Sequence, residues 1–262
     1  MAEQFKDQGG VATMDPSHLT RWLTSRLMTR ISGAAAVAAR HRKAEQARVK
    51  AAAPHRVDYF HQVDEGYSCL AAQTLERLAA RFDIELHCHL VRGQEGKNAP
   101  EPELLAQLAR ADSHEIAAGY GLSFPNHPEA PAAGLVETAS QVLAAQSHSD
   151  FPKAAVSVSE ALWRDDADRL AQLAAELGTA SPEATTAAIE AGTAKRRELK
   201  HYSGAMFYYG GEWYWGVDRL YHLEARLAAL GADTQPGTPL IAPRPGEDLA
   251  GHRDTGQFKL EL

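Results

Sequence analysis

The chain has 262 residues, of which 44% are hydrophobic and 23% are charged. This composition is typical of a globular protein, and the length allows one large domain or one domain with additions. No run of about 18 apolar residues occurs, which excludes a helix that spans a bilayer.

The two cysteines, Cys69 and Cys88, exclude a disulfide framework, and their spacing fits neither a C-x-x-C motif nor a metal site. We interpret them as reduced, buried thiols, against the alternative that one of them is functional. The N-terminal region does not resemble a signal peptide, because its short alanine-rich stretch is followed by the basic run that starts at Arg40. We therefore expect a cytoplasmic protein.

The net charge of −7 is spread unevenly along the chain. Residues 18–56 contain nine Lys or Arg and one acid, Glu45, so this segment carries +8 and the remainder carries −15. A basic arm on an acidic body favours contact with a membrane surface, nucleic acid or another protein. Of these, peripheral membrane contact through the arm is the functional interpretation, and we expect no nucleic acid. The alternative is a helix that packs on the domain and leaves its charges in water.

In chain order, residues 1–14 are expected to be disordered. The basic N-terminal helical arm, residues 15–56, begins at a capping sequence, Asp15-Pro16-Ser17. Apolar residues then recur at helical spacing as far as Ile31, and a second stretch rich in Ala, Arg and Lys is expected to be helical over residues 34–53.

The folded body begins with an extended apolar run at Val57, a turn at Asp64–Gly66 and a helix that ends near Phe82. Residues 83–91 alternate as a strand does, so the two strands and their connecting helix predict a parallel βαβ unit. The middle of the chain is rich in helical patterns. We expect helices over residues 102–118, 132–147, 151–163, 167–177 and 182–199.

Two aromatic strands, residues 205–209 and 212–215, follow and are joined by Gly210-Gly211, which predicts a hairpin. An amphipathic helix over residues 217–230 closes the body. The order β-α-β, helices, β-β-α predicts an α/β fold, a thioredoxin-like mixed sheet with a central all-helical insertion. Residues 57–92 and 200–231 would form the thioredoxin-like domain and residues 93–199 the inserted helical domain. Residues 232–262 are expected to be a linker and the start of a second module, because the chain ends on an alternating run.

Short motifs add a family resemblance that covers about Val57 to Leu230. They are Tyr67-Ser68 with Leu70-Ala71-Ala72, Gly119-Tyr120-Gly121-Leu122 with Phe124, Glu160-Ala161-Leu162-Trp163, and Gly211-Glu212 with Trp215-Gly216 and Asp218-Arg219-Leu220. In this order and spacing they resemble the DsbA-like thioredoxin-fold family, in the branch of 2-hydroxychromene-2-carboxylate isomerase and kappa-class glutathione transferase.

The chain departs from that family at two positions. The family has C-x-x-C or S-P-Y-S in the turn after the first strand, whereas this chain has Glu65-Gly66-Tyr67-Ser68, so Glu65 stands where the first Cys or Ser would be. A domain without paired thiols cannot cycle a disulfide. The family's cis-proline before the aromatic strand is replaced by Ala205. We expect a trans bond there, because a cis bond at a non-proline residue costs about 2.5–4 kcal/mol.

Glu65 and Ser68 are the candidate catalytic residues. A helix N-terminus stabilises an ionised carboxylate, so Glu65 could act as a general base, or it could be an ordinary first-turn acid. Ser68 could donate a hydrogen bond to a thiolate or an enolate, as the family's serine does, or it could cap its own helix.

The resemblance also implies a ligand site, with glutathione as the candidate cofactor. The residues that it assigns to this site are Tyr67, Gly204, Ala205 and Asp218. Asp218 matches the acid that holds the amino end of glutathione, or it caps the last helix. His87 and His89 have the H-x-H spacing of some metal sites, but no third ligand is evident and we expect no metal.

Two functional hypotheses remain open. In the first, the chain is a DsbA-like domain without the C-x-x-C motif, the cis-proline or thiol redox activity. It would act in binding, or as one module of a larger protein, with a small molecule or a second thioredoxin-like module as its partner. In the second, it is a glutathione-dependent isomerase or transferase that resembles 2-hydroxychromene-2-carboxylate isomerase.

Overall fold

The computed structural model describes residues 17–93, 101–125 and 129–241. The expectations for residues 1–14 and for the alternating run at residues 258–262 lie outside the described residues. Contacts divide the chain into two compact units, residues 1–43 with 248–262, and residues 44–247.

In the first unit the structure describes helix α1 (His18–Ser32) and the beginning of α2 (Ala34–Lys50), as the sequence predicts. Ser17 is the N-cap of α1, and its hydroxyl accepts a hydrogen bond from the Thr20 amide. Within the described residues, no helix has both the length and the hydropathy needed to cross a membrane.

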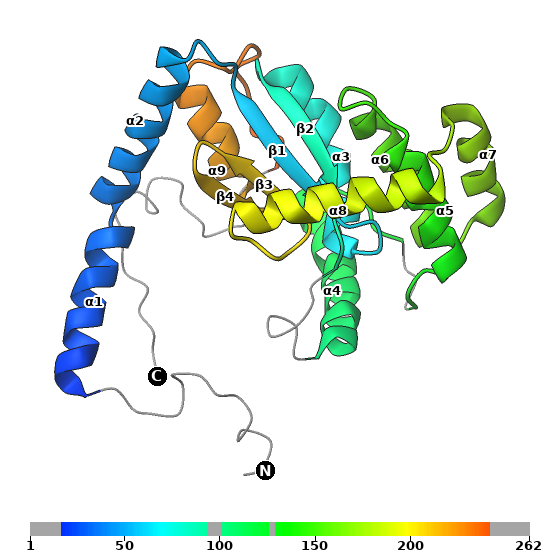
Figure 1. The fold of residues 1–262 in the computed structure, drawn as a ribbon, viewed down its shortest axis with the longest axis horizontal. Coiled ribbons are helices and arrows are strands. Elements are labelled where there is room, and N and C mark those ends of the chain that lie inside the picture. Colours follow the sequence, from blue (N-terminus) through cyan, green and yellow to red (C-terminus); the bar gives the residue numbers. More distant parts are fainter. Residues whose placement is uncertain (1–16, 94–100, 126–128, 242–262) are drawn as a thin grey trace. The chain divides into compact units, whose positions relative to one another are not determined.

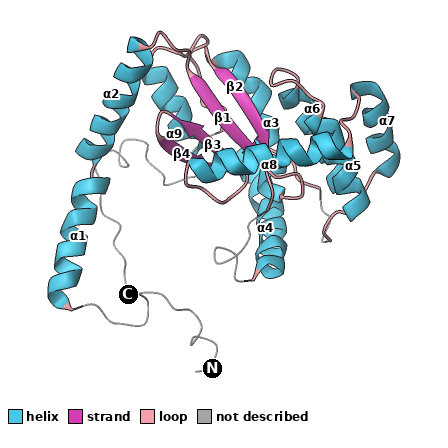
Figure 2. Ribbon diagram, viewed as in Figure 1, coloured by secondary structure: helices cyan, strands magenta, loops and turns pink. Residues whose placement is uncertain are grey.

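The second unit contains a four-stranded mixed sheet (Figure 2). Its strands are β1 (Arg56–His61), β2 (Glu85–Leu90), β3 (Met206–Tyr209) and β4 (Glu212–Trp215), in the order β2-β1-β3-β4. β1 pairs with β2 in parallel, and β3 pairs antiparallel with both β1 and β4. The predicted βαβ unit and the predicted hairpin are therefore both confirmed.

Alternation along β1 divides its side chains between two helical layers. Tyr59 and Val57 enter the main core with α3 (Gly66–Arg81), α6 (Phe151–Trp163) and α9 (Gly216–Ala229). Phe60 lies in a smaller cluster with Met206 on the opposite face. There α8 (Pro182–Glu198) crosses the sheet (Figure 1) and approaches β2 so closely that a methyl group on Gly192 would overlap the Leu90 carbonyl oxygen.

The segment between β2 and β3 is helical among its described residues. It contains α4 (Pro102–Ala117), a 3-10 turn η3 (Ala118–Tyr120), α5 (Ala133–Ala144), α6, α7 (Ala167–Leu177) and α8. These helices therefore stand between β2 and β3 in the sequence, as predicted. They pack with the sheet in one compact unit, and this unit begins at Ala44, inside the arm predicted over residues 15–56.

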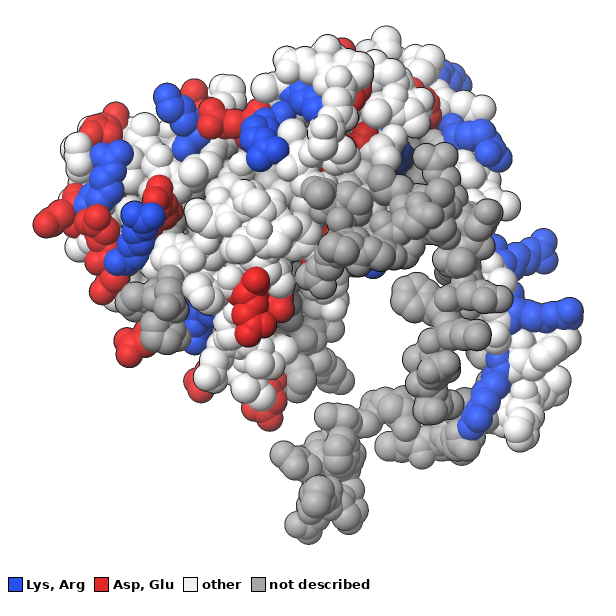
Figure 3. Space-filling view, turned by 180° about the vertical axis from the view of Figure 1, so that it is seen from behind, with Lys and Arg blue, Asp and Glu red and all other residues white. Residues whose placement is uncertain are grey.

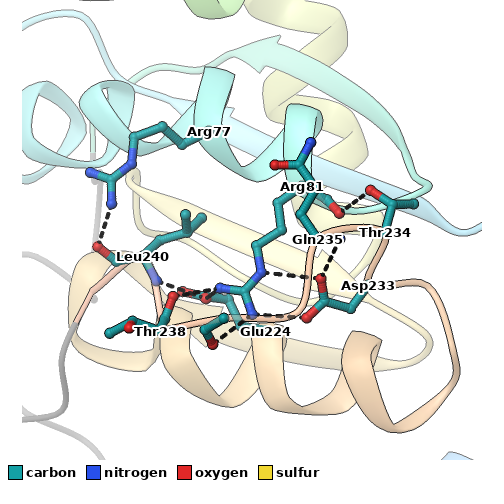
Figure 4. Close-up of polar contacts among 9 residues, drawn as sticks. Arg77, Arg81, Glu224, Asp233, Thr234, Gln235, Thr238 and Leu240 are labelled. Atoms are coloured by element: carbon teal, nitrogen blue, oxygen red, sulfur yellow. Dashed lines mark hydrogen bonds and ion pairs between the residues drawn. The ribbon is translucent and has the colours of Figure 1, made fainter.

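The residues after α9 differ from the linker that the sequence predicts. Ala232 and Ile241 are buried in the main core, and the Asp83 amide donates a hydrogen bond to the Ala232 carbonyl. The guanidinium of Arg81 holds this segment through the Asp233 carboxylate and the Thr238 carbonyl, as Figure 4 shows. Residues 232–241 are therefore a strap that covers α3 and α9.

Candidate functional site

The candidate site is the turn between β1 and α3. β1 ends at His61, and α3 begins at Gly66, with Glu65 as the residue before its first turn. The Glu65 backbone is extended (φ −112°, ψ 126°), and its side chain makes no capping bond to the first-turn amides. Its carboxylate instead accepts a 2.8 Å hydrogen bond from the hydroxyl of Ser68.

The Ser68 hydroxyl connects three segments of the chain. It donates to Glu65 Oε2, and it accepts a 3.1 Å hydrogen bond from the Gln62 amide and another of 3.1 Å from the Ala205 amide. A hydroxyl offers one donor and two acceptor positions, so all three are used. Because Ser68 is also fully buried, its role in this structure is to hold the turn against the loop that precedes β3.

That loop contains Gly204 and Ala205, two of the four residues that the family resemblance assigns to a ligand site. The described residues contain no cis peptide bond, so the trans bond expected at Ala205 is confirmed. Ala205 adopts a left-handed backbone conformation (φ 50°) and directs its N–H into the protein, toward Ser68. A side chain on Gly204 would overlap the Glu65 carboxylate, so this close approach requires glycine.

Burial of the Glu65 carboxyl group raises its pKa to about 7. The hydrogen bond from Ser68 and the charge of Arg196 act in the opposite direction, and the nearby Asp64 raises the pKa further. The sequence predicts that the helix N-terminus stabilises the ionised form of Glu65, but burial has the larger effect. The residue retains some solvent exposure, whereas its carboxyl end is packed between Ser68 and Gly204.

A histidine that the sequence analysis did not assign to the site lies directly behind the turn. His61 is fully buried, and burial lowers its pKa to about 3, so it is neutral. Its Nδ1 lies 3.1 Å from the Tyr59 hydroxyl, and that hydroxyl donates to the Ser68 carbonyl. The His61 Nε2 has no hydrogen-bond partner among the described residues.

The other two residues that the resemblance assigns to the ligand site, Tyr67 and Asp218, form hydrogen bonds with side chains of the helical insertion. The hydroxyl of Tyr67 donates a 2.8 Å hydrogen bond to the Asp112 carboxylate on α4. The hydroxyl of Tyr120 donates to Asp218 in the first turn of α9. Tyr67 and Asp218 therefore connect the insertion to the N-terminal ends of α3 and α9.

The N-terminus of α3 is covered. A side chain on Gly66 would lie 2.6 Å from the Ser113 hydroxyl and 3.2 Å from the ring of Phe124. Ser113 is itself buried on α4, and its hydroxyl has no hydrogen-bond partner among the described residues. An anion at this helix end would have to displace these side chains.

Both thiols are buried, as the sequence predicts. Burial raises the pKa of Cys69 to about 12, with a further contribution from Glu160, and burial also raises the pKa of Cys88. Thiolate is the reactive form of cysteine, so neither thiol is activated in this structure.

The H-x-H pair on β2 contacts acidic side chains. His89 Nε2 lies 2.8 Å from Asp58 on the neighbouring strand, and His87 Nε2 lies 3.5 Å from Glu85. The ring of His148, which the sequence analysis did not consider, lies tilted beside that of His87 with the ring centroids 4.6 Å apart. In the part of the chain that the structure describes, no group of three or more His, Cys, Asp or Glu residues is arranged to hold a metal ion.

No protein-family model matches the chain, and no curated protein sequence matches it. Among solved structures, 2-hydroxychromene-2-carboxylate isomerase is similar, with 21% sequence identity and a TM-score of 0.51. The similarity covers 67% of this chain and 96% of the isomerase. This chain has the thioredoxin-like fold of that isomerase. The fold that the sequence resemblance predicts is therefore confirmed.

Two further solved structures are similar at lower TM-scores. A probable DsbA oxidoreductase from Streptomyces coelicolor has 14% identity and a TM-score of 0.49, with 70% of this chain and 93% of the oxidoreductase covered. The cytosolic disulfide reductase DsbM from Pseudomonas aeruginosa, solved with GSH, has 16% identity and a TM-score of 0.44, with 67% of this chain and 97% of the reductase covered.

Proposed function

We propose that this thioredoxin-fold chain performs no disulfide exchange and acts in binding, alone or as one module of a larger protein. The observation that carries the proposal is the bond between Ser68 and Glu65. A carboxylate lies at the turn where exchange would need an attacking thiol, and the Ser68 hydroxyl is fully engaged with Glu65 and two backbone amides.

The state of the two thiols supports the same proposal. Exchange requires a thiolate that can reach its substrate, and both Cys69 and Cys88 are buried with raised pKa values. Buried, unpaired thiols also agree with a reducing compartment such as the cytoplasm.

Glutathione binding is disfavoured by the same geometry. The one backbone donor of Ala205 already binds the Ser68 hydroxyl in a buried position. A glutathione molecule held by the Ala205 amide would have to replace that bond, and the buried hydroxyl would lose a partner, which is costly.

Two measurements on the full chain test this proposal. In an insulin-reduction assay with dithiothreitol we expect no acceleration by the chain. We expect Ellman's reagent to modify Cys69 and Cys88 only after denaturation. Catalysed reduction that is lost in Cys69→Ala or Cys88→Ala would contradict the proposal.

A second candidate, a glutathione-linked isomerase, is favoured by one observation. A carboxyl group whose pKa is about 7 can both accept and return a proton near neutral pH, which suits Glu65 to general acid–base catalysis. The test is turnover of 2-hydroxychromene-2-carboxylate with glutathione, together with calorimetric titration of glutathione. Turnover that is lost in Glu65→Gln, and affinity that is lost in Asp218→Ala, would favour this enzyme over the binding role.

A further inference from the structure

Helix α1 presents large apolar side chains to solvent. Five of them are between 51% and 65% exposed: Leu19, Trp22, Leu23, Leu27 and Met28. Apolar side chains exposed in a series of this size on one short helix indicate an interaction surface.

Four of the five lie on the same side of α1 as two arginines. With 3.6 residues per turn, residues three, four, seven or eight positions apart share a side of a helix. Leu19, Trp22, Leu23, Arg26, Leu27 and Arg30 follow this spacing, and we call their side the lipid face. The opposite side carries Arg21, Thr24, Ser25 and Met28.

The charge of this region has one sign. Residues 17–43 contain six Lys or Arg and no Asp or Glu, and the region of α1 in Figure 3 shows basic side chains without acidic ones on the face in view. On the lipid face, the guanidinium of Arg26 lies 4.5 Å from the ring centre of Trp22. An arginine beside a tryptophan combines a charge for phosphate with a ring suited to the boundary between headgroups and hydrocarbon.

We propose that the lipid face of α1 binds the surface of a bilayer that contains anionic lipids. The helix would lie in the plane of the interface, with its leucines among the upper acyl carbons and Arg26 and Arg30 reaching up to the headgroup phosphates on their long alkyl stems. Its 15 residues span about 22 Å, too short to cross a membrane.

Charge complementarity selects this partner. Binding to nucleic acid uses cations against phosphates and gains little from a row of leucines between them. A bilayer with anionic lipids can take up both kinds of side chain, because the alkyl stems of Arg26 and Arg30 pack among the leucines while their guanidinium groups turn toward the phosphates. The acidic body of a second copy of this chain is the remaining oppositely charged surface, and the experiment includes it as an outcome.

The experiment is flotation of the full chain with vesicles of phosphatidylcholine, with and without phosphatidylserine. The lipid face offers two matched pairs of variants. Leu19 and Met28 are nine positions apart, as are Arg21 and Arg30, and nine residues are about two and a half turns, so each pair has one member on either side. The variants are Leu19→Ser against Met28→Ser, and Arg30→Gln against Arg21→Gln.

We expect binding to vesicles with phosphatidylserine that weakens as salt is added. Leu19→Ser should weaken partitioning about tenfold and Arg30→Gln about fivefold, whereas Met28→Ser and Arg21→Gln should change it less than twofold. Any of three results would overturn the proposal: no binding to anionic vesicles, equal losses in both members of each pair, or self-association of the chain that the Leu19→Ser variant abolishes while vesicles stay unbound.

Discussion

The hydroxyl of Ser68 donates a 2.8 Å hydrogen bond to the carboxylate of Glu65, three residues earlier in the chain. This bond uses the one donor of the Ser68 hydroxyl and holds the carboxyl group in the turn between β1 and α3. It also keeps a titratable group of raised pKa in a buried position, and this has consequences for stability.

The first prediction concerns Glu65. Its folded-state pKa of about 7 lies above the unfolded value near 4.5, so the folded state binds more protons and this group lowers stability as pH rises through that interval. Glu65→Gln should raise the free energy of unfolding by about 1–2 kcal/mol at about pH 8, after discounting for partial exposure, and by almost nothing at about pH 4. Urea unfolding at both pH values measures the difference.

Asp64→Asn is the matched control for Glu65→Gln, because Asp64 is the neighbouring acid and is exposed. We expect it to change stability by less than about 0.5 kcal/mol at either pH. Equal pH profiles for the wild type and Glu65→Gln would show that the carboxyl group of Glu65 is not held in a buried position.

The second prediction concerns His61, whose effect has the opposite sign. Its pKa is lowered to about 3 from 6.5, so the unfolded state binds more protons and stability falls as pH drops below about 6.5. Between its two pKa values, each such group changes the free energy of unfolding by about 1.4 kcal/mol per pH unit. Between about pH 6.5 and 4.5 the slopes of His61 and Glu65 should nearly cancel.

Substitutions at the two positions separate these contributions. His61→Phe keeps a ring against Phe151 and should give a protein whose stability falls as pH rises from about 4.5 to 7. Glu65→Gln should give a protein whose stability rises with pH over most of that range. In the double variant, as in the wild type, stability should be nearly independent of pH there. A flat profile in His61→Phe alone would refute the assignment.

The sequence predicts most of this fold but only part of the site. Alternation in residues 83–91 and the glycine pair Gly210-Gly211 identify β2 and the hairpin, because both signals are local. The third bond of Ser68 is not local, since it comes from Ala205, 137 positions later. No pattern near Ser68 can reveal it.

The sequence predicts a linker at the strap for a different reason. Several of its bonds join side chains to backbone carbonyls, such as Arg81 to Thr238 and Arg77 to Leu240. Carbonyl groups are present at every residue and leave no trace in composition. A segment rich in Pro and Gly therefore has the sequence signature of a linker although it packs on the domain.

The third prediction tests the backbone at Ala205. Its φ of 50° is unfavourable for alanine but not for glycine, and its amide donates to Ser68. Ala205→Gly should therefore raise the free energy of unfolding by up to about 1 kcal/mol. Ala205→Pro, which introduces the proline that the resembled family has at this position, should lower the free energy of unfolding by about 3 kcal/mol or more, because proline cannot adopt this φ or donate the bond. Stabilisation by proline would contradict the geometry.

The fourth prediction uses two glycines that both lie in helices. A methyl group on Gly192 would overlap the Leu90 carbonyl, whereas one on Gly134 of α5 would meet nothing within 4 Å. Gly192→Ala should therefore separate α8 from β2 and cost about 3 kcal/mol. Gly134→Ala should be neutral or stabilising by up to about 1 kcal/mol. Thermal unfolding of both variants measures the contrast, and similar melting temperatures would show that α8 does not pack closely on β2.

The fifth prediction concerns Arg81, which holds the strap. Its guanidinium bonds Asp233 at 2.8 Å and Glu224 at 3.3 Å, and the side chain is 12% exposed. Burial raises the pKa of Glu224, partly offset by the Leu240 amide and by Arg81. Arg81→Met would leave that carboxylate buried without its cation and should lower the free energy of unfolding by about 3 kcal/mol. Limited proteolysis within residues 232–241 should accelerate as the strap detaches.

Two variants separate this network from a general effect of charge. Arg81→Lys should recover little of the loss, because an ammonium group cannot reproduce the two-pronged bond to Asp233 together with the bonds to the Thr238 and Gly237 carbonyls. Arg77→Met removes one bond, to the Leu240 carbonyl, from an exposed side chain, and should cost less than about 1 kcal/mol. Equal stability of Arg81→Met and Arg77→Met would contradict this prediction. The strap would then be held by its apolar contacts, above all Ile241 in the core, and not by the guanidinium of Arg81.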